Sequence, residues 1–178
     1  KRFADAGADY VKFQTTRVKH LNPADPQYAW FQQAELSDDA HFELKAACEE
    51  AGTKFLTTLY NVAELPLIHA LGCDTVKLGS GETRDAALLT RSVREATSLR
   101  VLRSVHWQWL DGFCFDDPRL STMVCVTRYP ASERACLGAI DQMRIYGFRG
   151  YSDHSIGLSM ARWAIECGAT VIEKHCQL

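Results

Sequence analysis

The chain has 178 residues, of which 47% are hydrophobic and 24% charged, and its formal net charge is −2. This composition is typical of a globular protein with one sizeable core. The balanced charge lacks the basic field that attracts nucleic acid or anionic membranes, and no run of 18 apolar residues predicts a membrane span. We therefore expect a cytoplasmic protein that acts on small molecules, with neither nucleic acid nor membrane as partner.

Strand-like and helical patterns alternate along the sequence, which predicts a parallel sheet. The predicted strands span 9–15, 54–58, 74–78, 99–104, 121–126, 148–151 and 169–174, and the predicted helices span 37–51, 61–71, 85–96, 135–146 and 158–167. Ser37 is expected to cap the first long helix, and Gly52 to end it. Segment 16–36 is rich in proline and aromatic residues, so we expect a loop there that acts as a lid or an interface.

Repetition of one strand–helix unit, without a Gly-x-Gly-x-x-Gly motif, favours a (β/α)8 TIM barrel over an open Rossmann sheet. Only seven strands are predicted, and such barrels usually need at least ~200 residues. The predicted fold class is therefore α/β. A single TIM-barrel domain over residues 1–178 is expected to be incomplete, without its first strand and its closing helix.

Cysteines are spread widely, at positions 48, 73, 114, 125, 136, 167 and 176. The number is odd and no Cys-x-x-Cys pair occurs. We expect buried free thiols in a reducing cytosol, and a zinc site or a disulfide framework is the less favoured alternative.

Cations are expected on the inner face of the predicted strands. Lys12 and Gln14 alternate with apolar residues in the first strand, and Lys77 alternates with apolar residues in the third. Lysine is rarely buried without a partner, so two inward lysines predict a bound anion. A structural ion-pair network with Glu82 and Glu173 is the alternative.

Two short strings follow predicted strands and carry chemistry. Gly79-Ser80-Gly81 comes after Lys77, and its backbone amides can form a nest for an anion. Ser152-Asp153-His154 follows the sixth strand. Its imidazole is a candidate metal ligand or acid/base group, and a satisfied structural histidine is the alternative.

These strings, in this order, resemble the sialic acid synthase family, which comprises N-acetylneuraminate, pseudaminate and legionaminate synthases. The match is carried by segments 6–9, 11–15, 35–37, 55–58, 77–82, 129–130, 150–157 and 168–175. The resemblance implies a transferase that condenses phosphoenolpyruvate with an N-acetylated amino-sugar aldehyde, such as N-acetylmannosamine. The products would be a nine-carbon 2-keto acid and phosphate. The resemblance also implies a divalent metal, Mn²⁺ or Mg²⁺, and a homodimer.

The resemblance assigns roles to individual residues. Substrate binding is assigned to Lys12, Gln14, Thr58, Lys77, Ser80, Asp153 and Glu173, with phosphoenolpyruvate held by Lys12, Thr58, Lys77 and Ser80. Catalysis is assigned to Glu82, Lys77 and His154. His154 is also expected to be one of two histidine ligands of the metal.

The sequence departs from the family pattern in three places, and these departures bear on metal binding and on activity. Val124 stands where the family commonly has its second metal histidine, and Ser104 is followed by a different segment that begins Val105-His106. The first strand and a C-terminal antifreeze-like domain are expected to be absent. We therefore expect metal binding that is weak or lost, with His106 as a substitute ligand, and tighter binding after Val124→His.

The alternative function is a non-catalytic relative that keeps an anion-binding pocket without the metal. A related aldolase or 3-deoxy-keto-acid synthase would explain the lysines but not the Ser-Asp-His string.

Overall fold

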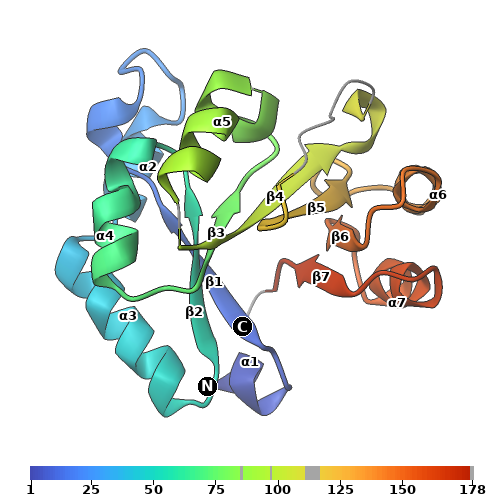
Figure 1. The fold of residues 1–178 in the computed structure, drawn as a ribbon, viewed down its shortest axis with the longest axis horizontal. Helices are drawn as coiled ribbons and strands as arrows, with labels where there is room; N and C mark the ends of the chain where they lie inside the picture. Colours follow the sequence, from blue (N-terminus) through green and yellow to red (C-terminus); the bar gives the residue numbers. More distant parts are fainter. Residues whose placement is uncertain (85, 97, 111–116, 177–178) are drawn as a thin grey trace. The chain divides into compact units, whose positions relative to one another are not determined.

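A computed structural model describes residues 1–84, 86–96, 98–110 and 117–176 (Figure 1). The chain divides into two compact units. Unit 1 comprises Lys1–Lys77 and Thr90–Leu99, and unit 2 comprises Leu78–Leu89 and Arg100–Leu178. In each unit, strands alternate with helices and every strand pair with a described register is parallel, as the sequence predicts.

Unit 1 holds strands in the order β1-β2-β3, except that Leu78, the last residue of β3, is counted with unit 2. Its elements are α1 (Arg2–Asp5), β1 (Tyr10–Thr15), a 3-10 helix (Val18–His20), α2 (Tyr28–Ala34), α3 (Asp38–Glu50), β2 (Lys54–Leu59), a 3-10 helix (Val62–Glu64), α4 (Leu65–Ala70) and β3 (Thr75–Leu78). The β1–β2 register runs from Tyr10 opposite Lys54 to Thr15 opposite Leu59. Thr58 of β2 lies opposite Lys77 of β3.

The helix-facing side of unit 1 is apolar. Phe13 of β1 stacks on Phe55 of β2 with ring centroids 5.2 Å apart, and both pack with Cys48 of α3. Because side chains alternate along a strand, Lys12 and Gln14 lie on the opposite face of β1. This confirms the two faces predicted from the alternation in the first strand.

Helix boundaries follow the capping residues. The Ser37 hydroxyl accepts a hydrogen bond from the backbone N–H of Ala40 at 3.1 Å, so it caps α3 as predicted. Gly52, just after α3, has a φ of +77°, the left-handed conformation that ends a helix.

Segment 16–36 contains more regular structure than the predicted loop. It holds the 3-10 helix Val18–His20 and the helix α2, neither of which has a buried residue. Without a buried face there is no apolar periodicity, so the sequence pattern gave no helix signal.

Unit 2 holds strands in the order β4-β5-β6-β7. Its elements are a 3-10 helix (Glu82–Arg84), β4 (Arg100–His106), a 3-10 helix (Trp107–Trp109), β5 (Leu120–Cys125), α6 (Glu133–Ile145), β6 (Gly150–Asp153), α7 (Ser159–Glu166) and β7 (Val171–Lys174). Helix α5 (Ala86–Glu95) divides between the units after Leu89. The predicted helix 85–96 begins at residue 85, which lies outside the described residues.

The core of unit 2 joins its strands to α6 and α7. Val124 of β5 lies opposite Tyr151 of β6, and both are fully buried with Ile140 of α6. Val124 therefore points toward the helices.

All six cysteines among the described residues are free thiols, as expected, and Cys114 lies outside those residues. Cys48, Cys125 and Cys136 are buried, whereas Cys176 is exposed. Burial is thus less general than predicted.

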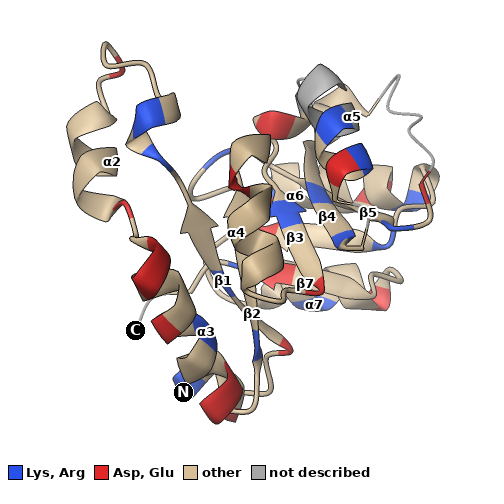
Figure 2. Cartoon of the chain, turned by 60° about the vertical axis from the view of Figure 1, so that its left-hand side comes forward, with Lys and Arg blue, Asp and Glu red and all other residues tan. Residues whose placement is uncertain are grey.

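Charged residues of both signs occur on the helix surfaces (Figure 2). Helix α3, for example, carries Asp38 and Asp39 in its first turn and Lys45 further along. Among the described residues, no helix combines the length and the apolarity needed to cross a bilayer.

Candidate active site

A row of polar side chains crosses the three strands of unit 1. The ammonium group of Lys12 donates a hydrogen bond to the Thr58 hydroxyl at 3.4 Å, and Thr58 lies opposite Lys77 in the strand register. Lys77 is only 3% exposed and Thr58 2% exposed. Gln14, opposite Thr58 on the other side, is exposed. The structure thus brings together three of the residues assigned to the anion, on the face that the alternation predicts.

The turn that carries Ser80 and Glu82 belongs to unit 2 and is fixed by Thr83. The Thr83 hydroxyl donates its one proton to the Ser104 carbonyl of β4 at 2.6 Å and lies 3.1 Å from the Ser80 carbonyl. The Thr83 backbone N–H donates to the Gly79 carbonyl at 3.2 Å. Sequence reasoning missed this buried threonine, which ties the glycine-rich turn to β4. Anion binding by the turn stays a prediction.

The imidazole of His154 is held in a single tautomer. Its Nδ1 lies within hydrogen-bond distance of the Val126 carbonyl, which can only accept, so Nδ1 carries the proton. Nε2 is therefore the basic nitrogen. In the neutral imidazole Nε2 accepts: the Ser152 hydroxyl, 3.2 Å from Nε2, donates its proton to Glu173 at 2.7 Å, which leaves the Tyr129 hydroxyl, 3.0 Å from Nε2, as the donor. A lone pair on Nε2 is the form that a metal requires.

Tyr129 covers His154 from one side. The two rings stack with centroids 4.0 Å apart and planes 28° apart. The residue as a whole is 62% exposed, yet its hydroxyl end lies in this stack. Burial there, with Glu173 and Cys125 nearby, raises the pKa of Tyr129 to about 12. Tyr129 therefore stays a proton donor at neutral pH.

His154, Glu173 and His175 form a candidate metal centre. Their ligand atoms all lie within 4.8 Å of one another, and the rings of the two histidines are 5.1 Å apart. Two imidazoles and a carboxylate suit divalent manganese, iron or zinc, so the donor set fits the metal implied by the resemblance. Sequence reasoning did not single out His175 as a candidate ligand. Its position two residues after Glu173, at the end of β7, was the available signal.

His106 lies outside this group of three. Its Nδ1 accepts a hydrogen bond from the Thr127 N–H at 3.2 Å, its Nε2 is 3.3 Å from Gln108, and its ring centroid is 4.6 Å from that of Trp109. The register pairs His106 with Cys125, so the ends of β4 and β5 do lie close together. The role of His106 as a metal ligand stays a prediction.

Asp153 fixes the loop that follows β6. Its carboxylate is fully buried and accepts hydrogen bonds from the Ser155 N–H at 2.9 Å, the Ser155 hydroxyl at 2.7 Å and the Lys174 ammonium at 2.8 Å. These contacts hold the backbone on both sides of His154. Contact of Asp153 with substrate stays a prediction.

Val124 changes the expectation for metal binding. Because its side chain lies in the apolar core of unit 2, a histidine at this position would enter that core rather than the group around His154. The tighter binding expected of Val124→His on sequence grounds is therefore no longer expected. His175 offers the second imidazole instead.

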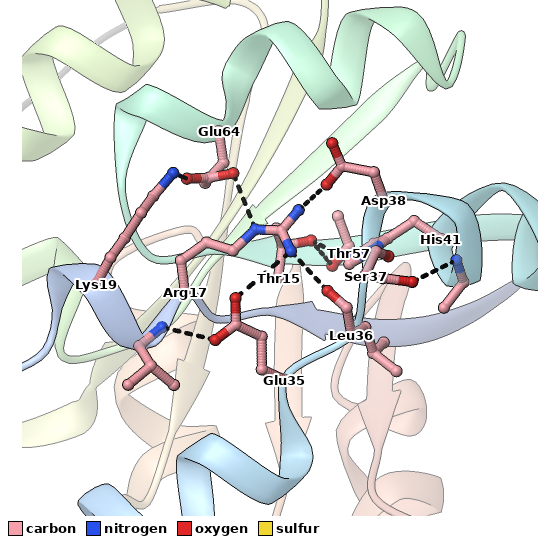
Figure 3. A network of polar contacts seen from close by, with 12 residues as sticks. Thr15, Arg17, Lys19, Glu35, Leu36, Ser37, Asp38, His41, Thr57 and Glu64 are labelled. Atoms are coloured by element: carbon pink, nitrogen blue, oxygen red, sulfur yellow. Dashed lines mark hydrogen bonds and ion pairs between the residues drawn. The ribbon is translucent and has the colours of Figure 1, made fainter.

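A second polar network in unit 1 surrounds Arg17 at the end of β1 (Figure 3). The Arg17 guanidinium donates to Glu64 at 3.1 Å and to the Leu36 carbonyl at 2.6 Å, and it also bonds to Asp38. The side chains of Arg17 and Glu64 are only 9% and 8% exposed. Arg17 thus ties segment 16–36 to the start of α3 and to the turn before α4. The sequence pattern did not indicate this role.

The network predicts acid sensitivity of unit 1. Burial opposes ionisation of Glu64, but hydrogen bonds from Arg17 and His20 outweigh it and lower the pKa of Glu64. A lowered folded-state pKa contributes stability above the unfolded value of about 4.3, and that contribution is lost as pH falls through the folded value. We expect the free energy of unfolding to fall below about pH 4, and to fall less in Glu64→Gln. Urea unfolding from pH 7 to 3 measures this, and parallel curves for the two proteins would contradict it.

Comparison with known proteins decides the family. The model of the NeuB family matches residues 1–105 and 115–178. The chain belongs to the NeuB family. It is 28% identical over 203 residues to an N,N'-diacetyllegionaminic acid synthase of Campylobacter jejuni, across 98% of this chain and 60% of that protein. It is 27% identical to an N-acetylneuraminate-9-phosphate synthase of Drosophila melanogaster, across 97% of this chain and 53% of that protein.

Solved structures confirm the fold of this NeuB-family chain. An N-acetylneuraminic acid synthetase from Leptospira borgpetersenii, in complex with citrate, aligns with a TM-score of 0.79 at 25% identity, over 97% of this chain and 64% of that one. A protein described as a spore coat polysaccharide biosynthesis protein E, from Chromobacterium violaceum, aligns with a TM-score of 0.81 at 25% identity, over 99% and 59%. The chain therefore has the fold of a partial (β/α)8 barrel, as predicted. It spans little more than half the length of the curated relatives that it matches.

Proposed function

We propose that the chain carries the barrel site of a sugar-acid synthase, which condenses phosphoenolpyruvate with an N-acetylated amino-sugar aldehyde to a nine-carbon 2-keto acid and phosphate. The row of Lys12, Thr58 and Lys77 on the polar face of unit 1 carries this proposal. Curated relatives of the family are synthases of legionaminic, pseudaminic and neuraminic acids, by their names. That shared chemistry supports the substrate class.

In the proposed reaction the two lysines hold the trianionic substrate. Lys77 is almost completely buried, so its ammonium group offers a strong, directed charge to a phosphate or carboxylate. Thr58, between Lys12 and Lys77, is assigned to the same substrate. Ser80 is assigned to the phosphate and Gln14 to the sugar, and Glu82 is assigned to the reacting carbons.

The metal would be held by His154, Glu173 and His175. When bound, it would polarise the sugar aldehyde as a Lewis acid. Neighbouring residues orient these ligands and fix the position of their protons. Val126 fixes the proton on His154 Nδ1, and Ser152 orients Glu173 with a 2.7 Å hydrogen bond.

One observation favours the alternative of a non-catalytic relative. In the sequence, Val124 stands where the family pattern has its second metal histidine. A protein that kept the lysines without the metal would bind phosphoenolpyruvate without turnover. A phosphate-release assay with manganese and N-acetylmannosamine separates the two readings. The homodimer and the cytoplasmic location stay predictions.

Lys77→Ala tests the anion site. We expect this variant to bind phosphoenolpyruvate roughly 10–100-fold more weakly, because a charge-assisted hydrogen bond in a buried site is removed. Isothermal titration calorimetry measures the affinity. The control is Lys54→Ala, since Lys54 is a lysine of the neighbouring strand β2 and its side chain is 63% exposed.

Equal affinities of the wild-type and Lys77→Ala proteins, or binding by neither, would refute this anion site. Circular dichroism of both variants shows whether a lost affinity reflects a lost fold.

A further inference from the structure

Unit 2 contains a cavity of about 680 Å³ at the N-terminal ends of its strands. Its lining includes the first residues of all four strands: Arg100 of β4, Leu120 of β5, Gly150 of β6 and Val171 of β7. His154 and His175 follow the C-terminal ends of β6 and β7. The cavity is therefore at the opposite end of the sheet from the candidate metal centre.

Among the described residues, the cavity lining carries more positive than negative groups. Arg100, Arg103 and Arg149 line it, together with Asp117. The Asp117 carboxylate accepts hydrogen bonds from the guanidinium of Arg119 at 3.0 and 2.8 Å, so its charge is already balanced. Three guanidinium groups thus line the cavity, and Asp117, the carboxylate among its described lining residues, is already paired with a fourth guanidinium, that of Arg119.

Hydroxyl groups orient two of these arginines. Arg103 Nε donates to the Thr122 hydroxyl at 2.8 Å, and Arg100 donates to the Ser121 hydroxyl at 3.2 Å. Arg103 is only 2% exposed, and burial lowers its pKa because the charged form is poorly solvated there. The two hydroxyls fix the direction of these side chains, and an anion in the cavity would stabilise the buried guanidinium of Arg103.

An aromatic pair borders the same cavity. The rings of Tyr146 and Phe148 lie 6.1 Å apart with planes 7° apart, and both residues line the volume. Small-molecule sites typically measure about 300–1,000 Å³ and combine apolar walls with a few directed polar groups. The volume and the apolar wall suit an anion with an organic part better than a bare ion.

We propose that this cavity is a second ligand site, separate from the candidate active site, for a phosphomonoester. The guanidinium groups of Arg100, Arg103 and Arg149 match phosphate oxygens in bidentate geometry, and a dianion balances more of their charge than a single carboxylate does. The aromatic pair contacts the organic part. This inference does not depend on the proposed reaction, because none of its residues belongs to the candidate active site.

Calorimetry in a Lys77→Ala background tests the site, since that change weakens the proposed phosphoenolpyruvate site. The probes are inorganic phosphate, glucose 6-phosphate and AMP, with chloride as the matched simple anion. We expect saturable 1:1 binding of the two phosphomonoesters, tighter than that of inorganic phosphate. Arg100→Ala and Arg149→Ala should each weaken it roughly tenfold. Both arginines are exposed, so these variants are expected to fold.

Arg134→Ala is the matched control, because Arg134 is an exposed arginine of α6 that does not line the cavity. Its affinity should equal that of the Lys77→Ala parent. The proposal is overturned if the arginine variants and the control weaken binding equally, or if no phosphomonoester binds in the Lys77→Ala background. Tighter binding of AMP than of glucose 6-phosphate would identify the aromatic pair as a stacking surface. The reverse order would identify a sugar phosphate as the ligand.

Discussion

His154→Ala should bind manganese roughly a hundredfold more weakly than the wild-type protein, since even a residue that only supports a ligand costs about 10–100-fold when it is lost. The Val126 carbonyl holds a proton on His154 Nδ1, so the neutral ring offers the lone pair of Nε2 to a metal. His175→Ala and Glu173→Gln remove the other two members of the group and should each weaken binding at least tenfold. Titration followed by electron paramagnetic resonance of free Mn²⁺ gives the affinities.

Three further variants make this test discriminating. His69→Ala removes an exposed histidine of α4 and should leave the affinity unchanged. His106→Ala should also leave it unchanged if the group of three is the site. If His106→Ala lowered the manganese affinity and His175→Ala did not, His106 would be the second histidine ligand, as predicted from the sequence. Val124→His should lower the free energy of unfolding without raising the affinity for manganese, because it places a polar ring in the apolar core.

The fold was predictable because its signals are local. The alternation of side chains in β1 predicts its two faces. Ser37 predicts the start of α3, and Gly52 predicts its end. Helix α2 was not predictable in this way. It buries no residue, so nothing in its apolar pattern distinguishes it from a loop.

The candidate site was predictable only where one strand carries the evidence. Lys12 and Lys77 are each recognised from their own strand. The pairing of Ser152 with Glu173 depends on the parallel register of β6 and β7, and the proximity of His154 to His175 depends on the loops after these strands. Such contacts are long-range and leave no periodic trace in the sequence. For the same reason Thr83, which joins the glycine-rich turn to β4, was missed.

Arg17→Met should lower the free energy of unfolding by about 3 kcal/mol, a large part of the ~5–15 kcal/mol typical of a domain. The change removes the cation from a buried pair and leaves the Glu64 carboxylate, 8% exposed, without its main donor. The cost lies at the lower end of the range for broken buried pairs because Lys19 and His20 remain at 3.5 and 3.1 Å from Glu64. Urea unfolding of the whole chain measures the loss. Amide hydrogen exchange, compared between the residues of the two units, should locate the loss in unit 1.

The double variant Arg17→Met, Glu64→Gln should recover part of that loss, because no uncompensated buried charge remains. Arg91→Met is the matched control. Arg91 also pairs with a glutamate, Glu95, but its side chain is 64% exposed, so its loss should cost less than about 1 kcal/mol. Equal losses for Arg17→Met and Arg91→Met would show that burial of the Arg17 network adds nothing to stability. If the double variant were as unstable as the sum of its single changes, the pair would not act as a unit, and segment 16–36 would have to be held by other contacts.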